Sequence, residues 1–191
     1  MTEDVSKFTG VGTVLLAGIA NMAPLAERLA PEQLFSLLRT YQECVISTIK
    51  RHSAVVYMFA GDDVMAYWHP RHTNPSHAQL AFDTSRAILD GLPQPSVPSS
   101  VPPYYVNIAL GTGEMGGDFF GPRKQFQVIG MAVSVTDRIS KVKRLQGSVV
   151  RMCQYTANML KNTDILRKAG RIKRDGLEPL RMFAYCPANI R

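Results

Sequence analysis

Hydrophobic and polar positions along the first third of the chain predict a strand, two helices and a hairpin. The segment 13–56 indicates an apolar strand, a short helix that starts after Pro24, and a long amphipathic helix that starts at Pro31. The next segment, YMFAGDDVMAYW at 57–68, is typical of a half- or fully buried hairpin, because mostly apolar runs flank the polar Gly-Asp-Asp turn at 61–63.

The rest of the chain continues to alternate strands with helices. Apolar positions at helical spacing predict a helix over 76–92 that stops at Gly91, and a Pro/Ser-rich loop follows. The remaining predicted elements are a strand at 104–115, a strand at 126–130 that turns at Gly130 into a helix, a strand at 147–152, a short helix at 153–162, and two strands that flank Gly176. This order predicts an α/β fold, an α+β sandwich with a ferredoxin-like βαββαβ core and additional helices and strands.

The hairpin turn places one carboxylate, that of Asp62, where two strands end. By itself this is a weak functional signal, because most Gly-Asp turns only reverse the chain. Two interpretations therefore stay open for Asp62: a ligand for a metal ion, or an acceptor of backbone hydrogen bonds in the turn. Asp63 is either a second ligand or a solvated neighbour.

Four blocks together resemble the catalytic domain of class III adenylyl and guanylyl cyclases. They are the strand and helices of 13–56, the hairpin of 57–68, the strand–helix FQVIGMAVSVTDRISKV at 126–142, and the closing strand at 175–185, with a Gly-rich stretch at 111–125 between the second and the third. The resemblance covers residues 9–186 and leaves short tails at 1–8 and 187–191.

The resemblance also implies functional positions, several of which have changed in this chain. Members of the family bind two metal ions, Mg²⁺ or Mn²⁺, with two aspartates; one matches Asp62, but the other falls on Gly18. The two residues that select the base fall on Met58 and Gln127. The transition-state asparagine falls on Ser134 and the transition-state arginine on Arg138. A phosphate-binding arginine of some members lies near Arg123 and Lys124.

These changes remove chemistry that the family's reaction needs. Attack of a ribose hydroxyl on the α-phosphate depends on two metal ions, and glycine at position 18 supplies no ligand for them. Met58 can pack against a purine but cannot hydrogen-bond its edge. Arg138 is compatible with transition-state stabilisation and with an interface or surface salt bridge, and Arg123 and Lys124 are compatible with an exposed basic turn.

Composition agrees with one domain of 191 residues, 46% of them hydrophobic. We expect a cytoplasmic protein or the cytosolic part of a larger one, because the chain has neither a signal peptide nor a run of eighteen apolar residues. The three cysteines Cys44, Cys153 and Cys186 are expected to be free thiols.

The net charge suggests a nucleic-acid site and the histidines suggest a zinc site, but the sequence favours neither. The formal net charge is +7, with basic runs at 141–144, 167–168 and 171–174, but no aromatic residues alternate with them as stacking platforms for nucleic acid. We therefore predict a solvated basic face. His69, His72 and His77 lie in a Pro-rich loop without cysteine or acidic partners at zinc-ligand spacing.

The sequence thus predicts a degenerate cyclase-homology domain that lacks turnover alone and acts as a regulatory or dimerisation module, paired with itself or with another cyclase-type domain. Two alternatives stay open. One is a working adenylyl or guanylyl cyclase, or half of one, with metal ligands such as Asp62 and Asp63. The other is a sensor that binds ATP or GTP without converting it.

Overall fold

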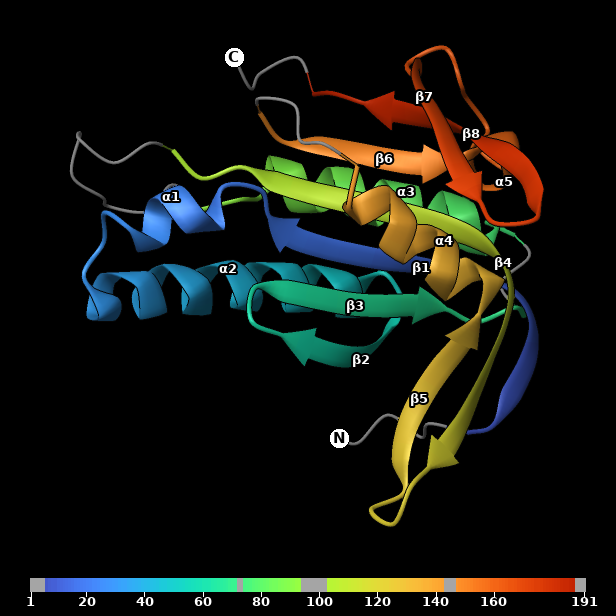
Figure 1. Cartoon of the computed structure of the whole chain (residues 1–191), viewed down its shortest axis with the longest axis horizontal. Coiled ribbons are helices and arrows are strands. Elements are labelled where there is room, and N and C mark those ends of the chain that lie inside the picture. The colour runs from blue at the N-terminus through green and yellow to red at the C-terminus, as the bar shows by residue number, and fades with distance from the viewer. Residues whose placement is uncertain (1–5, 72–73, 94–102, 143–146, 188–191) are drawn as a thin grey trace.

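The computed structural model describes residues 6–71, 74–93, 103–142 and 147–187, and is built around one eight-stranded sheet (Figure 1). The strand order is β2-β3-β1-β4-β6-β8-β7, and β5 pairs with β4 off this path. The strands are β1 (Phe8–Ile19), β2 (Val55–Ala60), β3 (Asp63–Trp68), β4 (Val106–Phe120), β5 (Gln125–Gly130), β6 (Val149–Cys153), β7 (Arg167–Arg174) and β8 (Leu177–Tyr185). The helices are α1 (Met22–Ala26), α2 (Pro31–Arg51), α3 (His77–Asp90), α4 (Met131–Ser140) and α5 (Gln154–Asn158).

Helices cover the two faces of the sheet in separate layers. On β1, Leu15, Ala17 and Ile19 pack in one core cluster with residues of α2 and α3, whereas Val14 and Leu16 pack in another with residues of α4. Side chains alternate between the faces of a strand, so Gly18 belongs to the α4 face. The mixed α+β class and the sandwich of layers predicted from the sequence are confirmed.

Several element boundaries differ from the sequence-based expectation. The first strand begins at Phe8 rather than near residue 13, because β1 pairs with β4 from Phe8 opposite Gly117 to Ile19 opposite Val106. Strand β4 likewise continues through the Gly-rich stretch to Phe120. Pro24 lies inside α1 rather than before it, a position that suits proline because the first turn of a helix needs no N–H donor there. The start of α2 at Pro31 and the end of α3 before Gly91 are confirmed.

The hairpin at 57–68 is buried on one strand only. All residues of β3 after Asp63 are buried, but Met58 and Phe59 of β2 are 42% and 54% exposed. The half-buried alternative therefore describes the hairpin as a whole, whereas the second half of β2, the edge strand of the sheet, is exposed. Exposed apolar side chains on an edge strand indicate a surface that another molecule could cover.

The basic residues of the last third lie mainly on the opposite edge strand. Arg167, Lys168, Arg171 and Lys173 of β7 are exposed, as predicted for a solvated basic face. The run at 141–144 falls partly outside the described residues, as do most of the Pro/Ser loop and both chain ends. Within the described ranges, no helix has the length and apolar character needed to cross a bilayer.

Candidate functional site

The hairpin turn brings Asp62 against the end of β1. The backbone N–H of Ile19 donates a hydrogen bond to Asp62 Oδ2 at 2.6 Å, and Gln42 Nε2 of α2 donates to the carbonyl of Gly61 at 2.9 Å. Gly61 has φ of +63°, the left-handed conformation that favours glycine in a turn. Asp62 thus accepts a backbone hydrogen bond from a strand distant in sequence, and its carboxylate is fixed beside Gly18.

Gly18 leaves room that the carboxylate of Asp63 fills. A Cβ atom built on Gly18 would come into contact with Asp63 Oδ1 and would lie 3.5 Å from Asp62 Oδ2. Any side chain at position 18 would therefore begin where the Asp63 carboxylate now lies. The hairpin supplies two adjacent carboxylates next to a strand position that supplies none.

A buried hydroxyl lies near this acidic pair. The side chain of Tyr41 on α2 is fully buried, and its hydroxyl has no hydrogen-bond partner among the described residues. Burial raises the pKa of Tyr41 well above its usual value, and the nearby charges of Asp62 and then Asp63 raise it further. Tyr41 therefore stays protonated and keeps an O–H donor close to the two carboxylates.

A polar cavity of about 340 Å³ opens between the sheet and the last turn of α4. Its floor includes Gly18 and Ala109, two positions with little or no side chain. Arg151 of β6 also lines it although its side chain is only 3% exposed, and β6 pairs with β4 so that Arg151 lies opposite Ala109. The remaining lining residues are Leu16, Asp63, Asn107, Ile108, Asp137, Ile139, Ser140, Lys141 and Val142.

A second and larger cavity contains the two positions matched to base selection. Met58 of β2 and Gln127 of β5 both line a cleft of about 820 Å³, together with Tyr57, Phe59 and Phe126. The structure therefore brings Met58 and Gln127 together across two strands that are not neighbours in the sheet order. Gly18 and Asp63 do not line this cleft, and Ser134, which is exposed on α4, lines neither of the two cavities.

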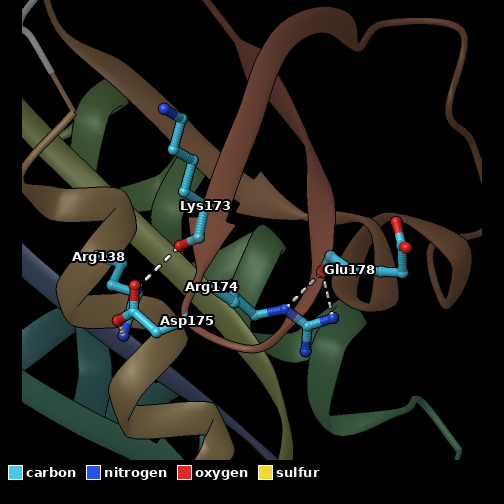
Figure 2. Close-up of polar contacts among 5 residues, drawn as sticks. All are labelled: Arg138, Lys173, Arg174, Asp175 and Glu178. Carbon is cyan, nitrogen blue, oxygen red and sulfur yellow. Dashed lines mark hydrogen bonds and ion pairs between the residues drawn. The ribbon is translucent and has the colours of Figure 1, made fainter.

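Arg138 is held by the turn between β7 and β8 (Figure 2). Its Nη1 donates to the carbonyl of Lys173 at 2.9 Å, and its Nη2 forms an ion pair with Asp175 at 3.3 Å. The ion pair is a surface one, because the Arg138 and Asp175 side chains are 38% and 97% exposed. Such pairs contribute about 0.2–1 kcal/mol, so the contact orients the guanidinium without locking it in place. Arg138 therefore forms a surface salt bridge, and its partner belongs to the same chain.

The two positions matched to phosphate binding lie on an exposed turn. Arg123 and Lys124 are exposed in the turn between β4 and β5, and Lys124 has φ of +46°. This hairpin projects from the rest of the molecule (Figure 1). Neither residue lines the two cavities, which agrees with the alternative interpretation as an exposed basic turn.

The residues present match a divalent metal ion only in part. Mg²⁺ is commonly held by one or two carboxylates plus phosphates of a substrate, and Asp62 with Asp63 would supply the carboxylates. Within the described residues, however, no group of three or more His, Cys, Asp or Glu side chains converges on one point. An ion at this place would therefore depend on oxygen atoms from a ligand, and it would polarise that ligand's phosphoryl group.

The histidines and cysteines give no support for another metal site. His77 is buried and shares a 2.8 Å hydrogen bond with Thr13, His69 accepts from the backbone of Arg71, and His72 lies outside the described residues. Cys44, Cys153 and Cys186 are all free, as predicted.

Sequence reasoning missed the residues that make the first cavity polar. Arg151 and Asn107 lie within otherwise apolar strands, VVRMC and VNIAL, and that interruption is the signal that could have identified them. Charged residues are almost never fully buried unless paired, so one predicted inside a buried strand points to a polar interior. Tyr41 gives no comparable signal, because aromatic residues on the buried face of a helix are ordinary.

Comparison with known proteins finds similar sequences and similar folds. No protein-family model matches the chain. Among curated proteins, adenylate cyclase 1 of Rhizobium meliloti (strain 1021) is 22% identical over 169 residues, and adenylate cyclase of Anabaena cylindrica is 26% identical over 166 residues. These matches cover 86% and 81% of this chain but only 25% and 30% of the relatives, so the chain spans less than a third of their length.

Solved structures agree over nearly the whole chain. The adenylyl cyclase CyaB from P. aeruginosa superimposes with a TM-score of 0.80 at 18% identity, and the match covers 97% of this chain and 98% of that one. The chain is similar in sequence to these two adenylate cyclases and shares the fold of this solved adenylyl cyclase. The guanylate cyclase domain of RhGC from Catenaria anguillulae, solved in complex with GTP, gives a TM-score of 0.76 at 14% identity over 94% of this chain and 97% of that chain.

Proposed function

We propose that this domain is a degenerate cyclase-homology domain that does not turn over nucleotide alone and acts by pairing with a second cyclase-type domain in the cytoplasm. The observation that carries the proposal is Gly18. The family resemblance expects a metal-binding carboxylate there, and the space for one is filled by Asp63. The transition-state asparagine position is Ser134, whose shorter side chain would not reach the same point.

The exposed apolar residues support the pairing part of the proposal. Met58 and Phe59 on β2, Ile129 on β5, and Phe119 and Phe120 on β4 are each more than 40% exposed. Met58 and Phe59 line one cavity and Phe120 and Ile129 line another, and exposed apolar side chains that gather in this way commonly mark interaction sites on a protein surface. A homodimer or a heterodimer with another cyclase-type domain would cover these side chains.

A specific observation favours a second candidate, a working adenylyl or guanylyl cyclase with Mg²⁺ or Mn²⁺. Asp62 and Asp63 place two carboxylates beside Gly18, so the second ligand would come from the hairpin instead of from β1. A sensor that binds ATP or GTP without turnover would use the same carboxylates and the cleft between Met58 and Gln127. Production of cyclic nucleotide separates the cyclase from the other two.

The pairing surface can be tested with two phenylalanines that differ only in location. We expect Phe59→Glu to weaken self-association at least tenfold, because burying one phenylalanine contributes about 1.5–3 kcal/mol and 1.4 kcal/mol is a factor of ten. Phe35→Glu is the matched control, because Phe35 is also highly exposed, at 64%, but lies on α2. Analytical ultracentrifugation over a concentration series measures both variants.

Three results would contradict the pairing surface. One is a strict monomer at high concentration that also fails to bind any cyclase-type domain from the same cell. Another is equal loss of association in both variants, which would point to a general effect of added charge. The third is a dimer that only Phe35→Glu weakens, because it would move the interface to α2.

A further inference from the structure

The two faces of the β7–β8 hairpin differ in character. Leu180 and Met182 of β8 are buried in the core cluster that includes α4, whereas Arg181 between them is exposed. Side chains alternate between the two faces of a strand, so Arg181 and Phe183 lie on the face away from α4. Phe183 is half-buried and packs against the core cluster of α2 and α3, which agrees with that direction. The hairpin forms one end of the sheet, with β7 as the edge strand (Figure 1).

Three exposed cations share the face away from α4. Arg171 of β7 lies directly opposite Arg181, and Lys168 lies opposite Phe183. Residues directly opposite each other on antiparallel strands have their side chains on the same face, with Cβ atoms about 4.5–5.5 Å apart. Lys168, Arg171 and Arg181, here called the basic triad, therefore lie side by side, and all three are exposed.

The charges of the basic triad are not neutralised by the described part of the chain. Its side chains form no ion pair with any described residue. Asp175, in the turn of the hairpin, pairs with Arg138 of α4. Arg174 binds the backbone carbonyl of Glu178, whose carboxylate points away from it (Figure 2). Like charges directly opposite each other on two strands are destabilising, so a bound anion would relieve the repulsion between the two arginines of the triad.

A phosphate monoester matches the basic triad in charge and in hydrogen bonding. It carries a charge of about −1.5 to −2 at pH 7 and has three strong acceptor oxygens. Guanidinium groups commonly bind phosphate through two parallel N–H···O bonds, and a lysine ammonium adds a point charge with three donors. Two guanidinium groups and one ammonium group therefore supply a donor for each phosphate oxygen.

Two other kinds of polyanion fit this surface less well. The aromatic residues of β8 on this face, Phe183 and Tyr185, are half-buried, and the Arg86 guanidinium lies over the Tyr185 ring at 5.6 Å. The face therefore lacks a row of exposed rings on which successive bases of a nucleic acid could stack. An anionic bilayer would gain about 1 kcal/mol from each basic residue but would also meet the exposed acidic side chains of Asp175 and Glu178. A phosphorylated protein segment presents its charge at one point and avoids both difficulties.

We propose that the basic triad binds a phosphate monoester carried by a segment of a partner protein. The phosphate bridges the guanidinium groups of Arg171 and Arg181, and the ammonium group of Lys168 completes the contact. This site lies on the opposite face of the sheet from α4 and at the opposite end of the strand order from β2. It therefore goes beyond the proposed pairing function.

Peptide binding to the full chain tests the proposal. The probes are short glycine–serine peptides with a central phosphoserine or phosphotyrosine, and the matched peptides carry the unmodified residue or glutamate at that place. We expect at least one phosphopeptide to bind at least tenfold more tightly than both of its matched peptides, as measured by fluorescence anisotropy at low salt. Equal binding of the unmodified peptide would overturn the proposal, and so would the absence of binding by both phosphopeptides.

Variants of equal charge assign the binding to one face of the hairpin. We expect Arg171→Gln and Arg181→Gln each to weaken phosphopeptide binding at least tenfold. Arg167→Gln is the matched control, because Arg167 is an exposed cation of the same strand that lies opposite the buried Ala184, on the α4 face. The control should lose less than twofold, and equal losses in all three variants would contradict the proposal by indicating a general effect of charge.

Vesicles that contain phosphatidic acid and a single-stranded oligothymidylate are the competing ligands. We expect both to bind the full chain more weakly than the phosphopeptide does. Tighter binding of either one, lost in Arg171→Gln, would contradict the proposal, because it would assign the basic triad to a membrane surface or to a nucleic acid.

Discussion

Gly111→Ala is expected to destabilise the protein by about 3 kcal/mol, because β4 and α4 touch at this residue. A Cβ atom here would lie 2.6 Å from the carbonyl oxygen of Ala132 and 2.9 Å from the backbone N of Thr136, and backbone atoms cannot move aside as a side-chain end can. Urea denaturation of wild type and variant gives the difference in unfolding free energy.

Gly116→Ala on the same strand is the matched control. A Cβ atom at Gly116 would lie 3.3 Å from the carbonyl oxygen of Phe8, a contact that a small shift relieves. We expect the control to lose much less stability than Gly111→Ala. An equal loss of unfolding free energy in the two variants would mean that the close approach of α4 to β4 does not cause the destabilisation. Because α4 carries Ser134 and Arg138, the same contact fixes where these residues lie.

Gly18→Asp alone is expected to lower the unfolding free energy by about 1–3 kcal/mol without creating a good metal site. The new side chain would begin in contact with Asp63 Oδ1, and two carboxylates forced together cannot both ionise readily. Adding Asp63→Asn removes one of the like charges. Because asparagine has the same size as aspartate, the double variant should regain only the part of the stability that was lost to charge repulsion, and it should bind Mn²⁺ more tightly than either single variant, as measured by urea denaturation and calorimetry.

The comparison of single and double variants tests whether Asp63 occupies the place of the missing carboxylate. Asp63→Asn alone is the control, since it removes a charge without filling the space at Gly18. Stronger Mn²⁺ binding by Gly18→Asp alone, with no loss of stability, would contradict the account. Additive effects in the double variant would also do so, because residues in contact should couple.

The sequence was sufficient for the fold because its strongest signals are local. Periodicity and the prolines and glycines next to the helices located α2 and α3, and the alternation of strands with helices indicated the mixed α+β class. The predicted strand boundaries were wrong where pairing between distant segments determines them. Strand β1 begins at Phe8 because it pairs with β4 from there on, and β4 continues through its glycines for the same reason. No local pattern contains that information.

The candidate site was predictable as a set of positions but not as an arrangement. The sequence named Gly18, Asp62 and Asp63, yet the overlap between the Asp63 carboxylate and a side chain at position 18 is a property of the packed hairpin. The grouping of Met58 with Gln127 also follows from packing. The contact of Arg138 with Asp175 joins α4 to a turn far along the chain, which periodicity cannot reveal.

Cyclic-nucleotide production by the pure full chain tests the central claim most directly. ATP or GTP is supplied with Mg²⁺ and, separately, with Mn²⁺, and cyclic AMP and cyclic GMP are measured over a range of protein concentrations that includes the dimer. Because Gly18 and Ser134 stand where the family resemblance expects a metal-binding aspartate and an asparagine, we predict no product above background under any of these conditions. Turnover that is present in the wild type and absent in Asp62→Ala would contradict the account and establish a cyclase whose metal ligands come from the hairpin.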